Sequence, residues 1–215
     1  MNRIILIIIV LTLSTFKSNA QGGITDVRDK FMFGLKVGIN YSNVYDSKGE
    51  KFNSDPKIGI ASGMFLAIPI GKYIGIQPEL MISQRGFRAT GNILGSPYTI
   101  TRTTNYIDVP LLFSFKPSEF LTLTAGPQYS YLISQRNVFA NATTTILQEQ
   151  EFENENIRKN TLSFIGGLEL TLKHFVFGAR VAMDAQNNNG DGTSKTPRYK
   201  NIWFQTIVGY RFYRQ

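Results

Sequence analysis

Residues 33–42, FGLKVGINYS, alternate without interruption between large side chains and small or polar ones. A period of two residues is typical of a β-strand whose two faces have different surroundings. In a soluble sheet the large apolar face packs in the core. In a membrane barrel the same face contacts lipid, and the small, polar face fills the lumen. The rest of the chain decides between these two arrangements.

The same alternation recurs in seven further segments: 58–70, 74–83, 106–115, 121–131, 162–172, 175–184 and 202–213. Tight turns follow the second, fourth and sixth segments. Longer polar stretches follow the first, third, fifth and seventh segments: 46–56, 88–105, 134–160 and 186–199. This layout predicts an all-β fold, an eight-stranded antiparallel up-and-down transmembrane β-barrel with short periplasmic turns and long extracellular loops.

Aromatic residues on the apolar face support the membrane interpretation. Phe33, Phe115, Phe175 and Phe212 fall at the short-turn ends of their segments, whereas Tyr41, Tyr129, Tyr131 and Phe204 fall near the long-loop ends. Two membrane interfaces select such a pair of aromatic belts. A soluble, lipocalin-like barrel fits the strand number, but it has no reason to sort its aromatic residues in this way.

The N-terminus predicts export. Arg3 precedes an apolar run over residues 4–13, and Ser18 and Ala20 supply small residues for cleavage before Gln21. The run is short for a spanning helix, so a secretory signal peptide is favoured over an uncleaved anchor. We therefore expect a signal peptide over 1–20, a short periplasmic segment over 21–31 and the barrel domain over 32–215.

Composition restricts the partners and the chemistry. The chain contains no cysteine, so disulfides and thiol chemistry are excluded. Its formal net charge is +8. An exported chain rarely meets nucleic acid, so we expect anionic lipid and lipopolysaccharide as partners. The expected location is the outer membrane of a Gram-negative bacterium.

The small, polar face carries charges of both signs. An eight-stranded barrel is only wide enough for side chains to fill, and buried charges must be paired. The sequence thus predicts a lumenal charge network. Its expected members are Lys36, Glu79, Arg85, Asp108, Glu169, Arg180, Asp184 and Arg211. The carboxylates could instead form an acid–base set or a proton path.

Several motifs resemble those of a known family. Residues 105–112, NYIDVPLL, resemble a recurring strand of the PorT-like "porin family" barrels of Bacteroidetes, as do residues 38–41, GINY, and 126–129, GPQY. Gly209, Tyr210 and Phe212 near the C-terminus resemble the signal read by the outer-membrane insertion machinery. The resemblance implies an outer-membrane barrel and suggests a setting in type IX protein secretion.

Catalysis and cofactors are not expected. The single histidine, His174, falls in a short turn with no serine or aspartate obviously beside it, so a nucleophile–base pair is not indicated. Residues 184–192 offer oxygen ligands and glycines for calcium, but they lack the bidentate glutamate at the expected spacing. We therefore expect a non-enzymatic protein with no cofactor.

Basic residues in or beside the long polar segments could contact lipopolysaccharide phosphates, or they could be solvated or pair with acidic residues 149–155. This rim consists of Arg88, Arg102, Lys195, Arg198 and Lys200. Two functions follow. The first is a structural or assembly component of the envelope that docks other envelope or secretion proteins. The second is a free-standing barrel that binds ligands or surfaces through its loops, and a narrow pore is the least favoured interpretation.

Overall fold

The computed structural model describes residues 26–46, 54–93, 96–141, 145–150, 158–188 and 199–213. The predicted signal peptide lies outside the described residues. Among the described residues, no helix is long and apolar enough to cross a membrane. Nine strands are described: β1 (Met32–Asp46), β2 (Ser54–Pro69), β3 (Ile74–Ile93), β4 (Ser96–Phe115), β5 (Leu121–Asn141), β6 (Thr145–Gln150), β7 (Asn160–Leu172), β8 (Phe175–Asp184) and β9 (Tyr199–Phe212).

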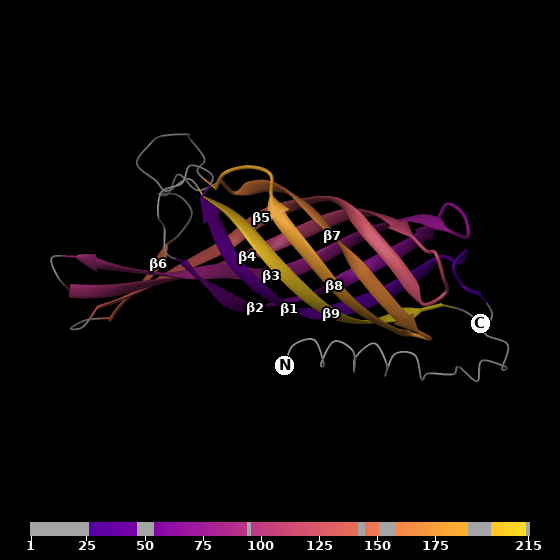
Figure 1. The fold of residues 1–215 in the computed structure, drawn as a ribbon, viewed down its shortest axis with the longest axis horizontal. Coiled ribbons are helices and arrows are strands. Elements are labelled where there is room, and N and C mark those ends of the chain that lie inside the picture. The colour runs from indigo at the N-terminus through magenta and orange to yellow at the C-terminus, as the bar shows by residue number, and fades with distance from the viewer. Residues whose placement is uncertain are drawn as a thin grey trace, which may run out of the picture.

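Eight of these strands close into a barrel, and all of the pairings are antiparallel (Figure 1). The order runs from β4 through β3, β2, β1, β9, β8 and β7 to β5, and a further β4–β5 pairing closes the ring. First and last strands meet along a long register in which Phe33 pairs with Phe212 and Asp46 with Tyr199. Closure leaves no edge in the barrel wall, as a membrane-spanning sheet requires. The eight-stranded prediction is confirmed.

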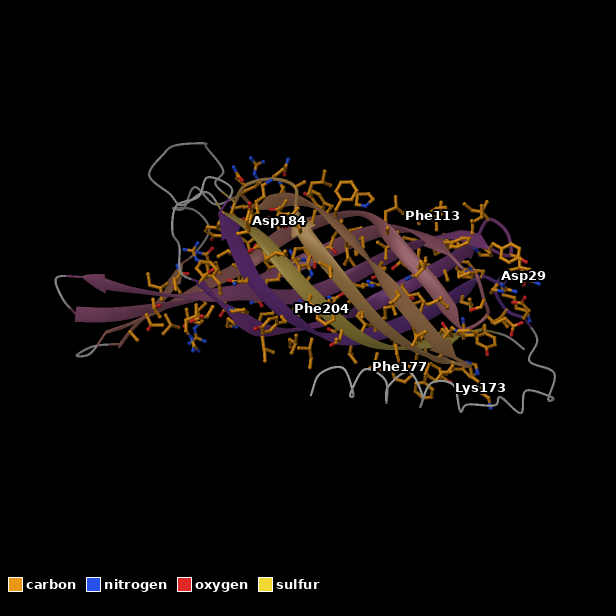
Figure 2. All side chains as sticks on the ribbon, in the orientation of Figure 1. Asp29, Phe113, Lys173, Phe177, Asp184 and Phe204 are labelled. Carbon is orange, nitrogen blue, oxygen red and sulfur yellow. The ribbon has the colours of Figure 1, made fainter. Side chains whose placement is uncertain are left out.

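The apolar face of every barrel strand points outward. Leu35, Val37 and Ile39 are exposed on β1, whereas the alternate residues Lys36 and Asn40 are fully buried. The two aromatic belts stand at opposite ends of this apolar surface, and Figure 2 labels Phe113, Phe177 and Phe204 along the barrel wall. At the short-turn end, Phe33 and Phe212 stack at 5.8 Å between ring centroids. An outward apolar wall requires a lipid environment, which answers the question raised by residues 33–42.

A row of polar side chains bounds the apolar wall at the end opposite the short turns. Gln84, Asn105 and Ser134 lie side by side on β3, β4 and β5. The Gln84 Nε2 donates to Asn105 Oδ1 at 3.1 Å, and the Asn105 Nδ2 donates to Ser134 Oγ at 2.8 Å. Because amides prefer the headgroup region to hydrocarbon, we infer that this row lies at the outer boundary of the membrane's hydrocarbon region.

Beyond this row the structure corrects the sequence prediction. Residues 88–105 were predicted as a loop, but β3 and β4 continue through most of them as a paired hairpin. Much of 134–160 is also strand, because β5 runs to Asn141 and β6 pairs with its outer part. These paired strands project well beyond the barrel (Figure 1). Ladder hydrogen bonds pair the backbone N–H and C=O groups of these strands. Because neither face of the projecting strands contacts lipid, their sequence lacks the alternation that marks the barrel wall.

Candidate functional site in the barrel interior

Four charged side chains meet across the lumen. Lys36 Nζ on β1 lies 2.8 Å from Glu79 Oε1 on β3 and 2.7 Å from Glu169 Oε1 on β7. Arg180 on β8 contacts both carboxylates, at 2.6 Å to Glu79 and 2.5 Å to Glu169. All four side chains are almost fully buried. We call these four residues the ion cluster.

The ion cluster is balanced in charge and well supplied with hydrogen bonds. Two cations face two carboxylates, and the Arg180 guanidinium binds Glu79 in a bidentate manner. Gln77 Nε2 adds donations to Glu79 at 2.9 Å and to Glu169 at 3.2 Å. Desolvated charges are tolerated only with such pairing and such additional hydrogen bonds.

Glycine makes room for this cluster. A Cβ on Gly167 would lie 2.2 Å from the Ala179 carbonyl oxygen and 2.8 Å from Cγ of Arg180, its neighbour across β7 and β8. Any larger residue would therefore clash with the β8 backbone as well as with the arginine stem. The glycine-rich inner face therefore lets long charged side chains cross a narrow lumen.

Arg85 forms a second layer. Its Nη2 donates to Asp108 Oδ2, which also accepts from Ser83 Oγ at 2.6 Å. The guanidinium carbon lies 3.6 Å from the ring centroid of Trp203 and 4.6 Å from that of Tyr106. The two aromatic faces stabilise the cation and fill the cross-section at this level.

Two further residues of the predicted network lie apart from the ion cluster. Asp184 Oδ1 accepts from Ser163 Oγ at 2.7 Å, and its Oδ2 accepts from Asn201 Nδ2 at 2.5 Å. Arg211 is only half buried near the short-turn end, where its Nε donates to the Lys173 carbonyl at 2.8 Å. These two side chains are hydrogen-bonded to hydroxyl, amide and backbone groups.

The three described residues of the predicted basic rim, Arg88, Arg102 and Lys200, have different surroundings. Arg102 points inward, where it donates to Asn137 Oδ1 at 2.9 Å and to the Tyr199 hydroxyl at 2.5 Å. Arg88 is exposed on the projecting part of β3, and Lys200 Nζ donates to the Ala185 carbonyl at 3.0 Å on another side of the barrel. Lys195 and Arg198 lie outside the described residues. As an inward strand residue, Arg102 cannot act at the lipid-facing rim.

The outer end of the lumen is lined by the apolar cluster of Val44, Phe87, Ala89 and Tyr199 beside Arg102. At the other end, Val27 packs against Met32, Phe65, Ala67 and Val176. The described interior is therefore filled in layers, apart from a small hollow near the short-turn end.

A short segment before β1 closes the short-turn end. Asp26 pairs with Arg28 at 2.7 Å and with Lys72 of the β2–β3 turn at 3.0 Å. The Arg28 guanidinium beside Asp26 holds the pKa of that carboxyl well below its usual range, and Lys72 contributes in the same direction. The Asp26–Lys72 pair and the donation of Lys116 Nζ to the Arg28 carbonyl fasten the segment to the β2–β3 and β4–β5 turns.

The remaining candidate groups have ordinary surroundings. His174 Nδ1 lies 3.0 Å from the Arg211 carbonyl, and its ring stacks on Tyr210 and Tyr213. Tyr210 and Phe212 of the predicted insertion signal thus belong to an aromatic group at the short-turn end. The described part of the chain contains no group of three acidic or histidine residues placed to hold a metal, and residues 189–192 of the segment considered for calcium lie outside it.

Sequence reasoning placed most of these partners on the inner face but did not identify their pairs. The aromatic clamp of Tyr106 and Trp203 on Arg85 was missed, although a lone tryptophan on a polar face was a usable signal. The segment around Asp26 and Arg28 carried no pattern that could have indicated its docking.

Comparison with known proteins gives a family. The model of the outer membrane protein beta-barrel domain family matches residues 19–184. No curated protein matches the chain. Three solved structures illustrate the structural neighbours. Ail of Yersinia pestis, in complex with the heparin analogue sucrose octasulfate, is 16% identical, with 85% of this chain and 99% of that chain covered and a TM-score of 0.49.

Neisserial surface protein A is 9% identical, with 84% of this chain and 97% of that chain covered and a TM-score of 0.47. OprG from Pseudomonas aeruginosa is 14% identical, with 85% of this chain and 96% of that chain covered and a TM-score of 0.43.

Proposed function

The chain belongs to the outer membrane protein beta-barrel domain family, and on that premise we propose that it is a non-enzymatic structural or assembly component of the outer membrane. Its barrel anchors the chain in lipid, and its projecting strands dock other envelope proteins. We propose PorT-like type IX secretion as the setting, on the strength of the motifs in residues 38–41, 105–112 and 126–129.

The projecting strands carry this proposal. The β3–β4 hairpin pairs from Arg88 and Thr101 out to Ile93 and Ser96, above the polar row that bounds the apolar wall. The outer part of β5 and then β6 extend the same sheet. A paired sheet offers a partner a more rigid surface than single loops do, because less conformational entropy is lost on binding.

The filled lumen argues against transport as the main activity. The ion cluster and the clamp on Arg85 occupy successive levels of the interior with buried side chains. A narrow pore would require both layers to part, and a parted layer would leave buried charges without partners. Catalysis is disfavoured by the surroundings of His174, which contacts a carbonyl and two tyrosine rings.

A pull-down from native outer membranes in mild detergent tests the proposal. The bait carries a tag after Gln21, and a second bait has an Asn-Gly turn in place of residues 89–100, so that Arg88 and Thr101 close a shorter hairpin. A matched control changes the opposite end with Lys173→Asn and His174→Gly. Lys173 has a φ of 54°, which asparagine accepts.

We expect envelope proteins to co-purify in fixed ratio with the full-length bait and the control, but not with the shortened hairpin. Recovery of the barrel alone, with or without lipopolysaccharide, would overturn the assembly role. Binding of the full-length barrel to cell surfaces would then favour the second candidate, attachment through the same projecting strands. That candidate also rests on the height of the hairpin above the membrane boundary.

A further inference from the structure

A small hollow opens at the short-turn end, between the ion cluster and the segment that closes the barrel. Its lining includes Arg28 of that segment, Lys116 and Glu119 of the β4–β5 turn, and Arg211 of β9. Thr122 and Thr171 line it as well. This end carries the short turns, and Figure 2 labels Asp29 and Lys173 there. We expect it to face the periplasm.

Three cations converge on this hollow, and they are not equally neutralised. Arg28 is paired with Asp26. Lys116 is only 6% exposed, and its Nζ donates to the Arg28 carbonyl at 2.7 Å. Arg211 donates its Nε to a carbonyl and lies 5.3 Å from the Tyr213 ring. The contacts of Lys116 and Arg211 are thus to backbone carbonyls and an aromatic ring.

The two carboxylates in the lining do not offset this charge fully. Glu169 already binds Lys36 and Arg180 in the ion cluster. Glu119 lies on the exposed β4–β5 turn. Burial lowers the pKa of Lys116, and the neighbouring charges of Arg211 and Arg28 lower it further, against smaller opposing effects of Asp29 and Asp26. An anion in the hollow would relieve this repulsion by charge-assisted hydrogen bonds.

We propose that this hollow binds one carboxylate or phosphate group of a small periplasmic solute. Lys116 and Arg211 supply the positive charge, and Thr122 and Thr171 offer neutral hydroxyl donors beside them. Arg28 lies at one side of the hollow, where its Nη1 donates to the Lys116 carbonyl at 3.4 Å. The site is separate from the projecting strands, which stand at the opposite end of the barrel (Figure 1).

Calorimetric titration of the folded, detergent-solubilised barrel with inorganic phosphate, and separately with acetate, tests the site. The variants are Lys116→Gln and Arg211→Gln, each of which removes a charge but keeps a hydrogen-bond donor. Lys173→Gln is the matched control, because it removes an exposed cation from the same end. Emission from Trp203 reports whether each variant keeps its folded interior.

We expect saturable binding of at least one probe, and the probe that binds identifies phosphate or carboxylate as the preferred group. Either glutamine variant should weaken binding about tenfold or more, and Lys173→Gln should leave it unchanged. Two results would overturn the site: no saturable binding of either probe, or equal weakening by Lys173→Gln and the two lining variants. If one lining variant does not fold, the other decides the question.

Discussion

The guanidinium of Arg85 lies 3.6 Å from the ring centroid of Trp203, and the same guanidinium binds the buried carboxylate of Asp108. The arginine comes from β3 and the tryptophan from β9, so this contact joins strands separated by β2 and β1 in the ring. A charged layer held in this way stabilises the barrel only while both charges are present.

Arg85→Met should therefore destabilise the barrel strongly. Without its cation Asp108 is a buried unpaired carboxylate, and we expect a loss of about 3 to 5 kcal/mol in the free energy of unfolding. Adding Asp108→Asn should recover part of this loss, because it removes the stranded charge. Urea unfolding in lipid vesicles, followed by the gel mobility of the folded band, measures the free energy of unfolding of the single and the double variant. A double variant no more stable than Arg85→Met would contradict this pairing.

The outward wall predicts a depth-dependent cost for charge. Val37 is 60% exposed near the middle of β1, in one row with Val208, Phe177 and Leu170. Val37→Lys should cost about 2 to 4 kcal/mol of unfolding free energy in lipid vesicles. Tyr45→Lys, outward on the same strand but near its outer end, should cost at most about 1 kcal/mol. Equal costs at the two positions would argue against a membrane-spanning wall.

The segment that closes the short-turn end should be acid-sensitive. Arg28 lowers the folded-state pKa of Asp26, so this carboxylate stabilises the fold above its unfolded pKa of about 4. That contribution is lost as the pH falls further below 4 toward the folded value. The side chain is partly exposed, so we expect about 1 kcal/mol. Asp26→Asn should lose it at pH 7.

Unfolding midpoints of the wild type and Asp26→Asn, measured at pH 7 and near pH 3, test this expectation. The difference between the two proteins should be largest at neutral pH and smaller near pH 3. A constant difference across this range would show that Asp26 acts through something other than its charge.

How far the sequence could predict this molecule depended on what each segment faces. Where a strand separates lipid from lumen, the two environments impose opposite side chains, and alternation gave the correct inner face for Lys36, Glu79 and Arg180. Above the membrane both faces of the projecting strands lie outside lipid. The contrast between lipid-facing and lumen-facing side chains disappears there. The sequence therefore predicts Arg102 as a rim residue, although it points inward.

Pairing inside the lumen was less accessible still. Lys36 and Glu169 are 133 residues apart, and they meet only because ring closure and strand register bring β1 and β7 to the same level. Alternation indicates on which face of the sheet a residue lies, but not its level along the barrel axis. For that reason Asp184 and Arg211 were grouped with the network although serine, amide and carbonyl groups serve them.

Conductance across planar lipid bilayers tests most directly the claim that a filled lumen leaves the surfaces of this barrel to perform its function. The refolded wild-type barrel is added to a bilayer, and an unrelated wide porin confirms that inserted channels are detected. The interior layers formed by the ion cluster and by Arg85 predict no stepwise current above that of the protein-free bilayer. Reproducible current steps from the folded wild-type protein would contradict the account and restore the pore interpretation.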